Sequence, residues 1–455
     1  MSRFSSNLSK LVLLSLVLVI YCLESATCNA RHRRGRKQEP RQPSIQNSYI
    51  FNVLDYGAKG DGTTDDTKAF EATWIEACND EGSTIMVPPD YGFLVGPIIF
   101  SGLHCEENIV FQLDGRIIAP TNPKVWGSSG LLQWLEFSKL NGISIKGKGI
   151  IDGQGSVWWE NAPLEDQGDD SEQDVYAPRI VLISSTSKRK MPRTRPAALR
   201  FYGCSNVVVT GIIIQNSPKA HLKFDNCAAV QVSGITVSSP GDSPNTDGIH
   251  LQNSQNVVIN SSDIACGDDC ISIQTGSSAV FIHHVNCGPG HGFSIGGLGK
   301  DKTKACVSNI TVQDSTLQNT TTGVRIKTWQ GGSGSVQGIM FSNIQVSDVK
   351  TPIMIDQFYC DKRKCRNHTA AVAISGVSYQ SIKGTYSYKP VHFACSDSVP
   401  CTGVSLSAIE LNPSPEKKHF YGPYCWETYG ELRTNTTPPI DCIQPDKRIP
   451  SYDSC

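Results

Sequence analysis

Short runs of Val and Ile alternate with polar residues through much of the chain, and these runs recur at regular intervals. Cys204-Ser-Asn-Val-Val-Val-Thr-Gly-Ile-Ile-Ile aligns without a gap with Cys227-Ala-Ala-Val-Gln-Val-Ser-Gly-Ile-Thr-Val. Counted from Val207, similar runs follow at steps of 23, 27, 23, 30, 29, 33 and 32 residues, at Val230, Val257, Val280, Ile310, Ile339, Val372 and Val404. A period of two, punctuated by Gly, Asn and Ser, predicts strands and turns in place of helices.

Units of 20 to 30 residues with several short strands each are typical of a parallel β-helix. A leucine-rich repeat needs a regular Leu framework, which is absent, and a β-propeller needs units of about 40 residues. We therefore predict an all-β fold, a right-handed single-stranded parallel β-helix. The amphipathic segment Thr67 to Cys78, with Asp65 or Asp66 as its N-cap, is expected to form a helix that covers the N-terminal end of the solenoid.

The N-terminal residues read as a targeting segment. Arg3 and Lys10 precede an apolar run, Leu11 to Leu23, which has the length of a signal-peptide core. We predict a signal peptide over 1–30, although an uncleaved anchor is the alternative, and no other segment could cross a membrane. Residues 31–48 are predicted to be a basic disordered arm or pro-segment. Residues 49–455 would then be the β-helix catalytic domain, with an irregular charged insertion at about 163–195.

Composition points to an exported protein. The chain has 41 Lys plus Arg and 42 Asp plus Glu, so its net charge of -1 argues against nucleic-acid binding. Seventeen cysteines suggest an oxidising compartment, and 15 remain after removal of 1–30, so at least one is unpaired. Five glycosylation sequons agree with secretion; they begin at Asn260, Asn309, Asn319, Asn367 and Asn435.

Four polar segments share one strand-like frame. They are Thr246-Asp-Gly-Ile-His-Leu, Asp268-Asp-Cys-Ile-Ser-Ile, Gly290-His-Gly-Phe-Ser-Ile and Thr322-Gly-Val-Arg-Ile-Lys. Asp247, Asp269 and His291 follow one another at steps of 22 residues, so a β-helix would stack them on successive coils about 4.8 Å apart. Arg325 and Lys327 are two apart on a strand and share a face. The spacing therefore predicts one patch of acids, an imidazole and two cations.

Such a patch suits hydrolysis of an acidic sugar polymer. Crowded carboxylates cannot all ionise freely, so the pKa of at least one of them should rise. A neutral acid and an ionised carboxylate are what glycoside hydrolysis requires. The additional cations would suit a substrate that carries carboxylates, and a groove along a solenoid suits a linear chain. Each segment alone is more often a turn, a loop or a calcium ligand, and it is the shared spacing that favours catalysis.

These segments also carry a family resemblance. Asn245-Thr-Asp, Gly267-Asp-Asp, Gly290-His-Gly and Arg325-Ile-Lys, in this order and spacing, resemble the four signature motifs of polygalacturonases, glycoside hydrolase family 28. The segment from Phe51 to Thr67 is similar to the N-terminal part of pectin-active β-helices. Ile151-Asp-Gly-Gln-Gly and Gln215-Asn-Ser-Pro are similar to further family segments, and the leader with the Cys-rich C-terminus resembles plant members.

The resemblance implies inverting hydrolysis of α-1,4-linked homogalacturonan, the backbone of pectin, by a secreted monomer in the cell wall. It implies the following roles: Asp268 as general acid, Asp247 and Asp269 as activators of water, His291 as a support for the acid, and Asn245, Arg325, Lys327 and Tyr359 as substrate-binding residues. Tyr359 could equally be a core aromatic. No cofactor is implied, and scattered His residues without paired CxxC clusters argue against zinc.

The family pattern also suggests a disulfide between Cys270 and Cys287, and Cys360–Cys365 and Cys395–Cys401 are plausible local pairs. Three other functions stay open. One is an exo-acting or decorated-pectin hydrolase of the same family. The others are a calcium-dependent pectate lyase on a similar fold and a pectin-binding β-helix without activity.

Overall fold

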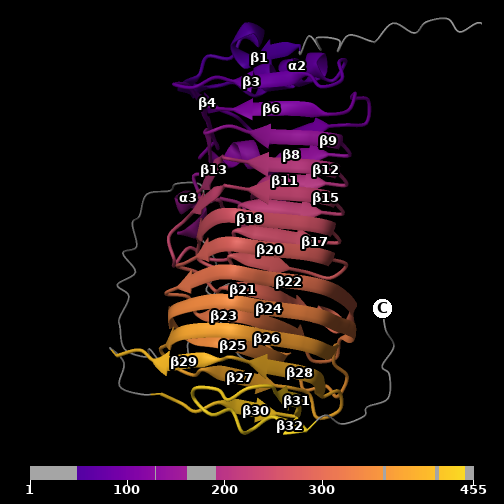
Figure 1. The fold of residues 1–455 in the computed structure, drawn as a ribbon. Coiled ribbons are helices and arrows are strands. Elements are labelled where there is room, and N and C mark those ends of the chain that lie inside the picture. The colour runs from indigo at the N-terminus through magenta and orange to yellow at the C-terminus, as the bar shows by residue number, and fades with distance from the viewer. Residues whose placement is uncertain (1–48, 129, 161–190, 362–364, 416–419, 446–454) are drawn as a thin grey trace, which may run out of the picture. The chain divides into compact units, whose positions relative to one another are not determined.

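We describe the protein from a computed structural model (Figure 1). The chain divides into two units, Met1–Asn47 and Ser48–Cys455. The structure describes residues 49–128, 130–160, 191–361, 365–415, 420–445 and 455, so the predicted signal peptide, the basic arm and most of the predicted insertion lie outside the described residues. Within the described part, no helix is long and apolar enough to span a bilayer.

The second unit is a right-handed parallel β-helix, as the repeat predicts. All the strand pairs within its two sheets are parallel. One sheet contains, in spatial order, β30 (Tyr424–Trp426), β27 (Val391–Ala394), β25 (Thr351–Tyr359), β23 (Thr322–Trp329), β21 (Phe293–Leu298), β19 (Ile271–Ile273), β17 (Ile249–Gln252), β14 (Leu222–Asp225), β11 (Ala197–Tyr202), β8 (Gln133–Ser138) and β5 (Ile98–Ser101). We call this the front sheet.

The other sheet forms the remaining walls. It contains β1 (Ile50–Asn52), β2 (Asp61–Asp65), β3 (Thr84–Val87), β4 (Gly92–Leu94), β6 (Ile109–Leu113), β7 (Arg116–Ile118), β9 (Asn141–Lys146), β10 (Ile150–Asp152), β12 (Ser205–Thr210), β13 (Ile213–Gln215), β15 (Ala228–Ser233), β16 (Thr236–Ser238), β18 (Gln255–Ala265), β20 (Ser278–Cys287), β22 (Lys304–Gln318), β24 (Ser333–Val349), β26 (Ala373–Tyr386), β28 (Cys401–Ser407), β29 (Glu410–Pro413), β31 (Thr428–Leu432) and β32 (Gln444–Pro445). β18 pairs with both β15 and β16, so two short strands become one long strand at this coil. β26 in turn pairs with both β28 and β29, so the long strand divides again near the C-terminal end.

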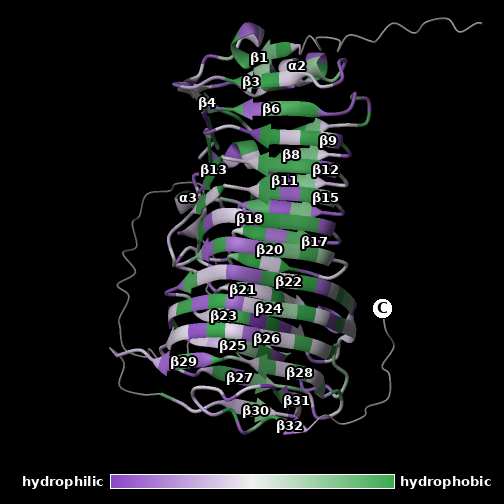
Figure 2. Ribbon diagram, viewed as in Figure 1, coloured by the Kyte–Doolittle hydropathy of each residue, from purple (hydrophilic) through white to green (hydrophobic). Residues whose placement is uncertain are grey.

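Inward-facing side chains form ladders along the axis, which is why the strands alternate between apolar and polar residues (Figure 2). Val207, Val230, Val257 and Val280 occupy one register position on successive coils and are buried. The residue before each of them makes a corner with positive φ, and Asn309 and Gly338 make the same corner on later coils at φ 57° and 67°. Asn and Gly tolerate this conformation, which explains their recurrence in the repeat.

One repeat assignment is wrong. The register pairs Ile339 with Val377, and Val377 with Val404, whereas the sequence pattern placed this repeat at Val372. Val372 is buried just before β26 and has the same character, so hydropathy alone does not separate it from Val377. The true steps are 38 and 27 residues, because the longer connection that carries Cys360–Cys365 separates β25 from β26.

The N-terminal end is covered by α2 (Thr67–Ala77), as predicted. Its Trp74 packs against Phe100 and Phe137 of the front sheet. Asp66 occupies the N-cap position, but its carboxylate accepts hydrogen bonds from Lys59 and Gly60 backbone N–H groups, while Asp65 accepts from the Thr67 backbone N–H. The other short helices are α3 (Ser156–Trp159), η1 (Val53–Tyr56), η2 (Pro123–Trp126) and η4 (Lys300–Lys302).

Six disulfides join described cysteines, and they occur at the N-terminal end, in the middle and at the C-terminal end of the β-helix. The structure pairs Cys270–Cys287, Cys360–Cys365 and Cys395–Cys401, and also Cys78–Cys105, Cys306–Cys455 and Cys425–Cys442. Among the described residues, Cys204, Cys227 and Cys266 are free and buried. Sequons at Asn309, Asn319, Asn367 and Asn435 are exposed and Asn260 is half-buried, so all five can be reached from solvent.

Candidate active site

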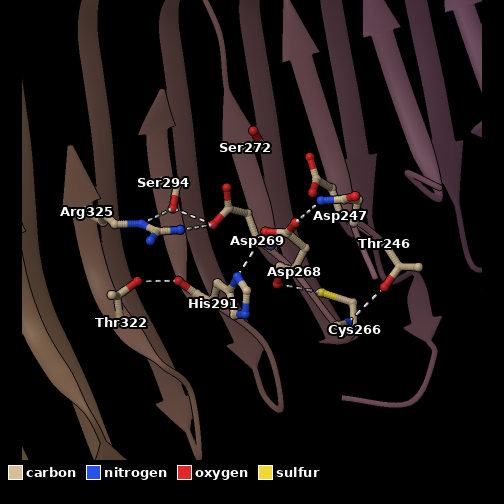
Figure 3. Close-up of polar contacts among 12 residues, drawn as sticks. Thr246, Asp247, Cys266, Asp268, Asp269, Ser272, His291, Ser294, Thr322 and Arg325 are labelled. Atoms are coloured by element: carbon tan, nitrogen blue, oxygen red, sulfur yellow. Dashed lines mark hydrogen bonds and ion pairs between the residues drawn. The ribbon is translucent and has the colours of Figure 1, made fainter. Parts of the chain in front are cut away.

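The candidate site lies on the outer face of the front sheet and on the loops that enter its strands (Figure 3). Ser272 on β19, Ser294 on β21 and Arg325 on β23 are register partners on three successive coils. The predicted acids and His291 lie in the loops that precede β17, β19 and β21. Gly292, which follows His291, has φ 80°, and a Cβ there would lie 2.2 Å from the Gly323 carbonyl oxygen. A glycine is therefore needed beside the histidine.

Asp268 and His291 form one pair. His291 Nδ1 lies 3.0 Å from Asp268 Oδ1, and Asn245 Nδ2 donates to Asp268 Oδ2 at 3.2 Å. Burial by itself would raise the pKa of Asp268, but the hydrogen bond and charge of His291, with the cations beyond it, hold this pKa well below its ordinary value. Burial by itself would lower the pKa of His291, yet Asp268 raises it. The pair therefore holds a proton on the imidazole.

Asp269 is fixed by cations and a hydroxyl. Arg325 Nη2 donates to its Oδ1 at 2.7 Å, Lys327 Nζ donates to its Oδ2 at 2.9 Å, and Ser294 Oγ donates to Oδ1 at 2.6 Å. Burial favours the neutral acid, but Lys327 and Arg325 outweigh it and lower the pKa of Asp269. The pKa of Lys327 is raised, because the carboxylates outweigh its burial and the charge of Arg325. This cluster is therefore permanently ionised near neutral pH.

Asp247 differs from the other two acids. Burial and the charge of Asp268 raise the pKa of Asp247, although His250 Nδ1, at 2.9 Å from its Oδ2, acts in the opposite direction. The side chain of Asp247 is 16% exposed and that of Asp268 18%, against 3% for Asp269. Asp247 and Asp268 are thus the more exposed of the three acids, and Asp247 is the stronger base.

Asp247, Asp268, Asp269 and Lys327 line one groove of about 760 Å³. His291, Ser294 and Arg325 contact these acids without lining the groove. Tyr359 lines it too, with Lys327 Nζ 5.2 Å from the centre of its ring and Trp329 packed at its edge. Its burial raises the pKa of the Tyr359 hydroxyl, so this group is neutral. Tyr359 therefore belongs to the wall of the groove, and Asn245 faces the same space.

Among the residues that the structure describes, one donor set is compact enough for a metal ion, and it lies at this site. Ligand atoms of Asp268, Asp269 and His291 lie within 4.8 Å of one another. Arg325 and Lys327 already neutralise Asp269, and two adjacent cations oppose a third positive charge. The donor set therefore fits an acid–base cluster better than a metal centre.

Comparison with known proteins gives the family. The model of glycosyl hydrolases family 28 matches residues 78–185 and 181–421. The chain belongs to glycosyl hydrolase family 28. This family 28 chain is 39% identical to a probable polygalacturonase from Arabidopsis thaliana over 96% of the chain and 94% of that protein. It is 40% identical to a polygalacturonase from Malus domestica, over 82% and 79%.

Solved structures support the fold of the family 28 chain. The polygalacturonase from Erwinia carotovora superposes with a TM-score of 0.62 at 22% identity, over 89% of this chain and 100% of that one. An endo-xylogalacturonan hydrolase from Aspergillus tubingensis superposes with a TM-score of 0.67 at 22% identity, over 82% and 95%. With its family established, the chain is a glycoside hydrolase.

The sequence analysis missed one buried residue of this family 28 site. Arg195 is 6% exposed; its Nη1 donates to the Pro244 carbonyl at 2.7 Å and its Nη2 to Asn245 Oδ1 at 2.8 Å. Asn245 in turn donates to Asp268, so Arg195 orients the amide that holds the acid. The sequence placed Arg195 at the end of an irregular insertion, and its one signal is the Arg-Pro that precedes the strand at Ala197.

Replacing Arg195 with alanine is expected to lower kcat by up to about 100-fold, because Asn245 loses the donor that fixes its orientation. The partly buried Asn245 amide oxygen and Pro244 carbonyl would also lose hydrogen bonds to a charged group, which costs about 1.5–3 kcal/mol of stability. Thermal unfolding and kcat measured together would test this. Arg193→Ala, in the same stretch of the groove rim, is the matched control, and equal losses in both variants would contradict a positioning role for Arg195.

Proposed function

We propose that this family 28 hydrolase is a polygalacturonase that hydrolyses α-1,4-galacturonosyl linkages of homogalacturonan with inversion. The observation that carries the proposal is one groove lined by an imidazole-linked acid, a second acid of raised pKa and Lys327, with Arg325 buried beside them on Asp269. The relatives named above support the substrate class. A carboxylate-bearing sugar accounts for the cations, which acid–base chemistry alone does not require.

Asp268 is proposed to protonate the leaving oxygen. In the free protein its pKa is low because His291, Lys327 and Arg325 outweigh its burial. A sugar carboxylate bound beside the two cations would offset their charge and exclude water, and both changes raise the pKa of Asp268. His291 Nδ1, which is proposed to carry the proton, lies 3.0 Å from Asp268 Oδ1, within reach for transfer. His291 is thus the proton reservoir of the acid.

Asp247 and Asp269 are proposed to activate the attacking water, each in a different role. Asp247 has the raised pKa and the exposed carboxylate, so it takes the proton from water. Asp269 is a weaker base, because its oxygens accept from Arg325, Lys327 and Ser294. Asp269 contributes orientation and negative charge, while Arg325, Lys327, Asn245 and Tyr359 are proposed to bind the substrate.

The decisive experiment is to incubate the protein with polygalacturonic acid, to size the products over time and to read the anomeric configuration of the new reducing end by NMR. The proposal expects shortened chains with inverted configuration. An unsaturated product absorbing in the ultraviolet, abolished by a chelator, would replace the proposal with a lyase. Binding without new reducing ends would replace it with a pectin-binding protein. Release of single sugars alone would show exo action.

The pH dependence of kcat/KM should be bell-shaped with an acidic optimum. On the acidic side of the profile, activity rises with pH as Asp247 ionises. Because the pKa of Asp247 is raised, this rise should occur above the ordinary Asp pKa of about 3.9. Activity falls as His291 loses its proton, and its raised pKa places that limb above about 6.5. A flat profile between about pH 4 and 8 would contradict the assignment, and His291→Ala should alter the basic limb.

We also propose secretion to the cell wall. The six disulfides between described cysteines and the five accessible sequons support an oxidising, glycosylating route. N-terminal sequencing of the protein recovered from culture medium would test whether cleavage falls near Ala30 and whether the basic arm is retained. A protein found only inside the cell would contradict this part of the proposal.

A further inference from the structure

A cluster of aromatic and basic side chains lies further along the front sheet, beyond the candidate site towards the C-terminal coils. It consists of Lys350, Tyr388, Lys389, His392, Tyr421 and Tyr424, and we call it the tyrosine platform. Tyr421 and Tyr424 are 55% and 40% exposed. No role has been given to this cluster in the chemistry above.

The platform continues the same face and the same loops as the candidate site. On the strands, Arg325 pairs with Met354, Met354 with His392, and His392 with Tyr424. This column runs from β23 through β25 and β27 to β30, which Figure 1 shows as consecutive coils. At about 4.8 Å per strand, Tyr424 lies roughly 14 Å from Arg325.

Backbone hydrogen bonds between the loops that precede the front-sheet strands also lead from the candidate site to the platform. The Thr321 backbone N–H donates to the Gly290 carbonyl beside His291, and the Lys350 N–H donates to the Thr320 carbonyl. Tyr388 and Lys389 then donate to the Lys350 carbonyl, and Tyr421 donates to that of Tyr388. The platform loops therefore stack, through the loop at Thr320 and Thr321, on the loop that carries the proposed proton reservoir.

The side chains of the platform are held by ring and cation contacts. Lys389 Nζ lies 5.7, 6.0 and 5.1 Å from the ring centres of Tyr388, Tyr421 and Tyr424, and Lys350 Nζ lies 5.6 Å from that of Tyr388. The rings of His392 and Tyr424 stack at 5.1 Å with 19° between their planes. Burial, with the charge of Lys389, lowers the pKa of His392 to about 4, so His392 is neutral and the charge of the platform resides on its two lysines.

From this geometry we infer that the tyrosine platform is a distal subsite that binds a uronate residue of the polymer, some three coils from the site of cleavage. The apolar face of a sugar ring packs on exposed aromatic rings, and Lys350 and Lys389 supply the positive charge that a sugar carboxylate requires. The inference rests on the proposed function, because it takes the groove to bind an acidic sugar chain. The platform residues do not line the groove itself. The occupant is inferred from charge complementarity and from the shared strand register that joins the platform to Arg325.

The test measures binding of galacturonate oligomers to the full chain carrying Asp268→Asn, which keeps the groove and stops turnover. A trimer centred on the acids is too short to cover both the groove and the platform, whereas an octamer covers both. Adding Lys389→Ala or Tyr424→Ala should weaken octamer binding about five- to ten-fold, at least several times more than trimer binding. With a methyl-esterified octamer, Tyr424→Ala should still weaken binding and Lys389→Ala should not.

Lys383→Ala and Tyr49→Ala are matched controls, because each removes an exposed side chain of the same type away from the front sheet. Octamer binding that is equal in the parent and in both platform variants would overturn the inference, and so would equal losses for trimer and octamer. A parent that binds neither oligomer, together with a wild-type protein that does not cleave the polymer, would overturn the proposed function and the inference with it. These outcomes are distinguishable.

Discussion

Replacing Asp268 with asparagine should lower kcat on de-esterified galacturonan by about 10²- to 10⁴-fold, the range that a positioned general acid contributes. The amide has the shape of the carboxyl group, so it can keep its single oxygen towards His291 Nδ1, although its NH2 group then replaces the oxygen that accepts from Asn245 Nδ2. It cannot give a proton to the leaving oxygen. The loss should therefore fall on kcat, while substrate binding through Lys327 and Arg325 persists.

The matched control is Asp263→Asn. Asp263 lies on the same coil as Asp268 but in β18, outside the front sheet, and its exposed carboxylate accepts a hydrogen bond from its register partner Asn286 on the next coil. Reducing-end release and thermal unfolding of both variants should separate chemistry from folding. We expect Asp263→Asn to retain near-wild-type turnover. Near-wild-type turnover of Asp268→Asn would refute its role as the acid.

The repeat in the sequence already specifies much of the fold and of the site. Because the coil length between Asp247, Asp269 and His291 is constant, counting residues places them on successive coils without coordinates. Counting failed where a connection changes length, and so Val377 was missed in favour of Val372. A pairing such as Cys306–Cys455, which joins residues 149 apart, depends on how the C-terminal segment returns and leaves no periodic signal.

The sequence predicts that the pKa of one acid is raised, but it does not predict which acid. Crowding of acids predicts that one pKa rises, and it does, but for Asp247 and not for the proposed acid Asp268. The direction depends on which cations and imidazoles lie beside each acid, and those beside Asp268 come from later coils. Arg195 is a similar case, since it lies at the end of the charged insertion and its contact with Asn245 spans 50 residues.

Replacing Lys327 with methionine is expected to affect stability and binding together. The methionine keeps the apolar stem but leaves Asp269 Oδ2 without its 2.9 Å donor in a buried site. Removing one partner of a buried ion pair costs about 3–5 kcal/mol, and Arg325, which still contacts Oδ1, places the loss near the lower bound. Lys383→Met, which breaks an exposed pair with Glu410, should change stability by about 1 kcal/mol or less.

A double-mutant cycle with Asp269→Asn distinguishes the pair from the rest of the site. If the cost of Lys327→Met comes from an uncompensated Asp269 carboxylate, then denaturant unfolding should show a much smaller cost when position 269 is already an amide. Equal costs in both backgrounds would mean that Lys327 stabilises the fold through packing against Tyr359.

The kinetics of Lys327→Met then decide what the buried cation does for the substrate. A rise in KM for the acidic polymer that disappears for its methyl ester would show that Lys327 reads the sugar carboxylate. A fall in kcat alone, on both polymers, would mean that Lys327 acts through Asp269 and the water that it orients. We expect both effects, because one ammonium group contacts Asp269 and lines the groove, and it therefore couples substrate charge to the acid–base cluster.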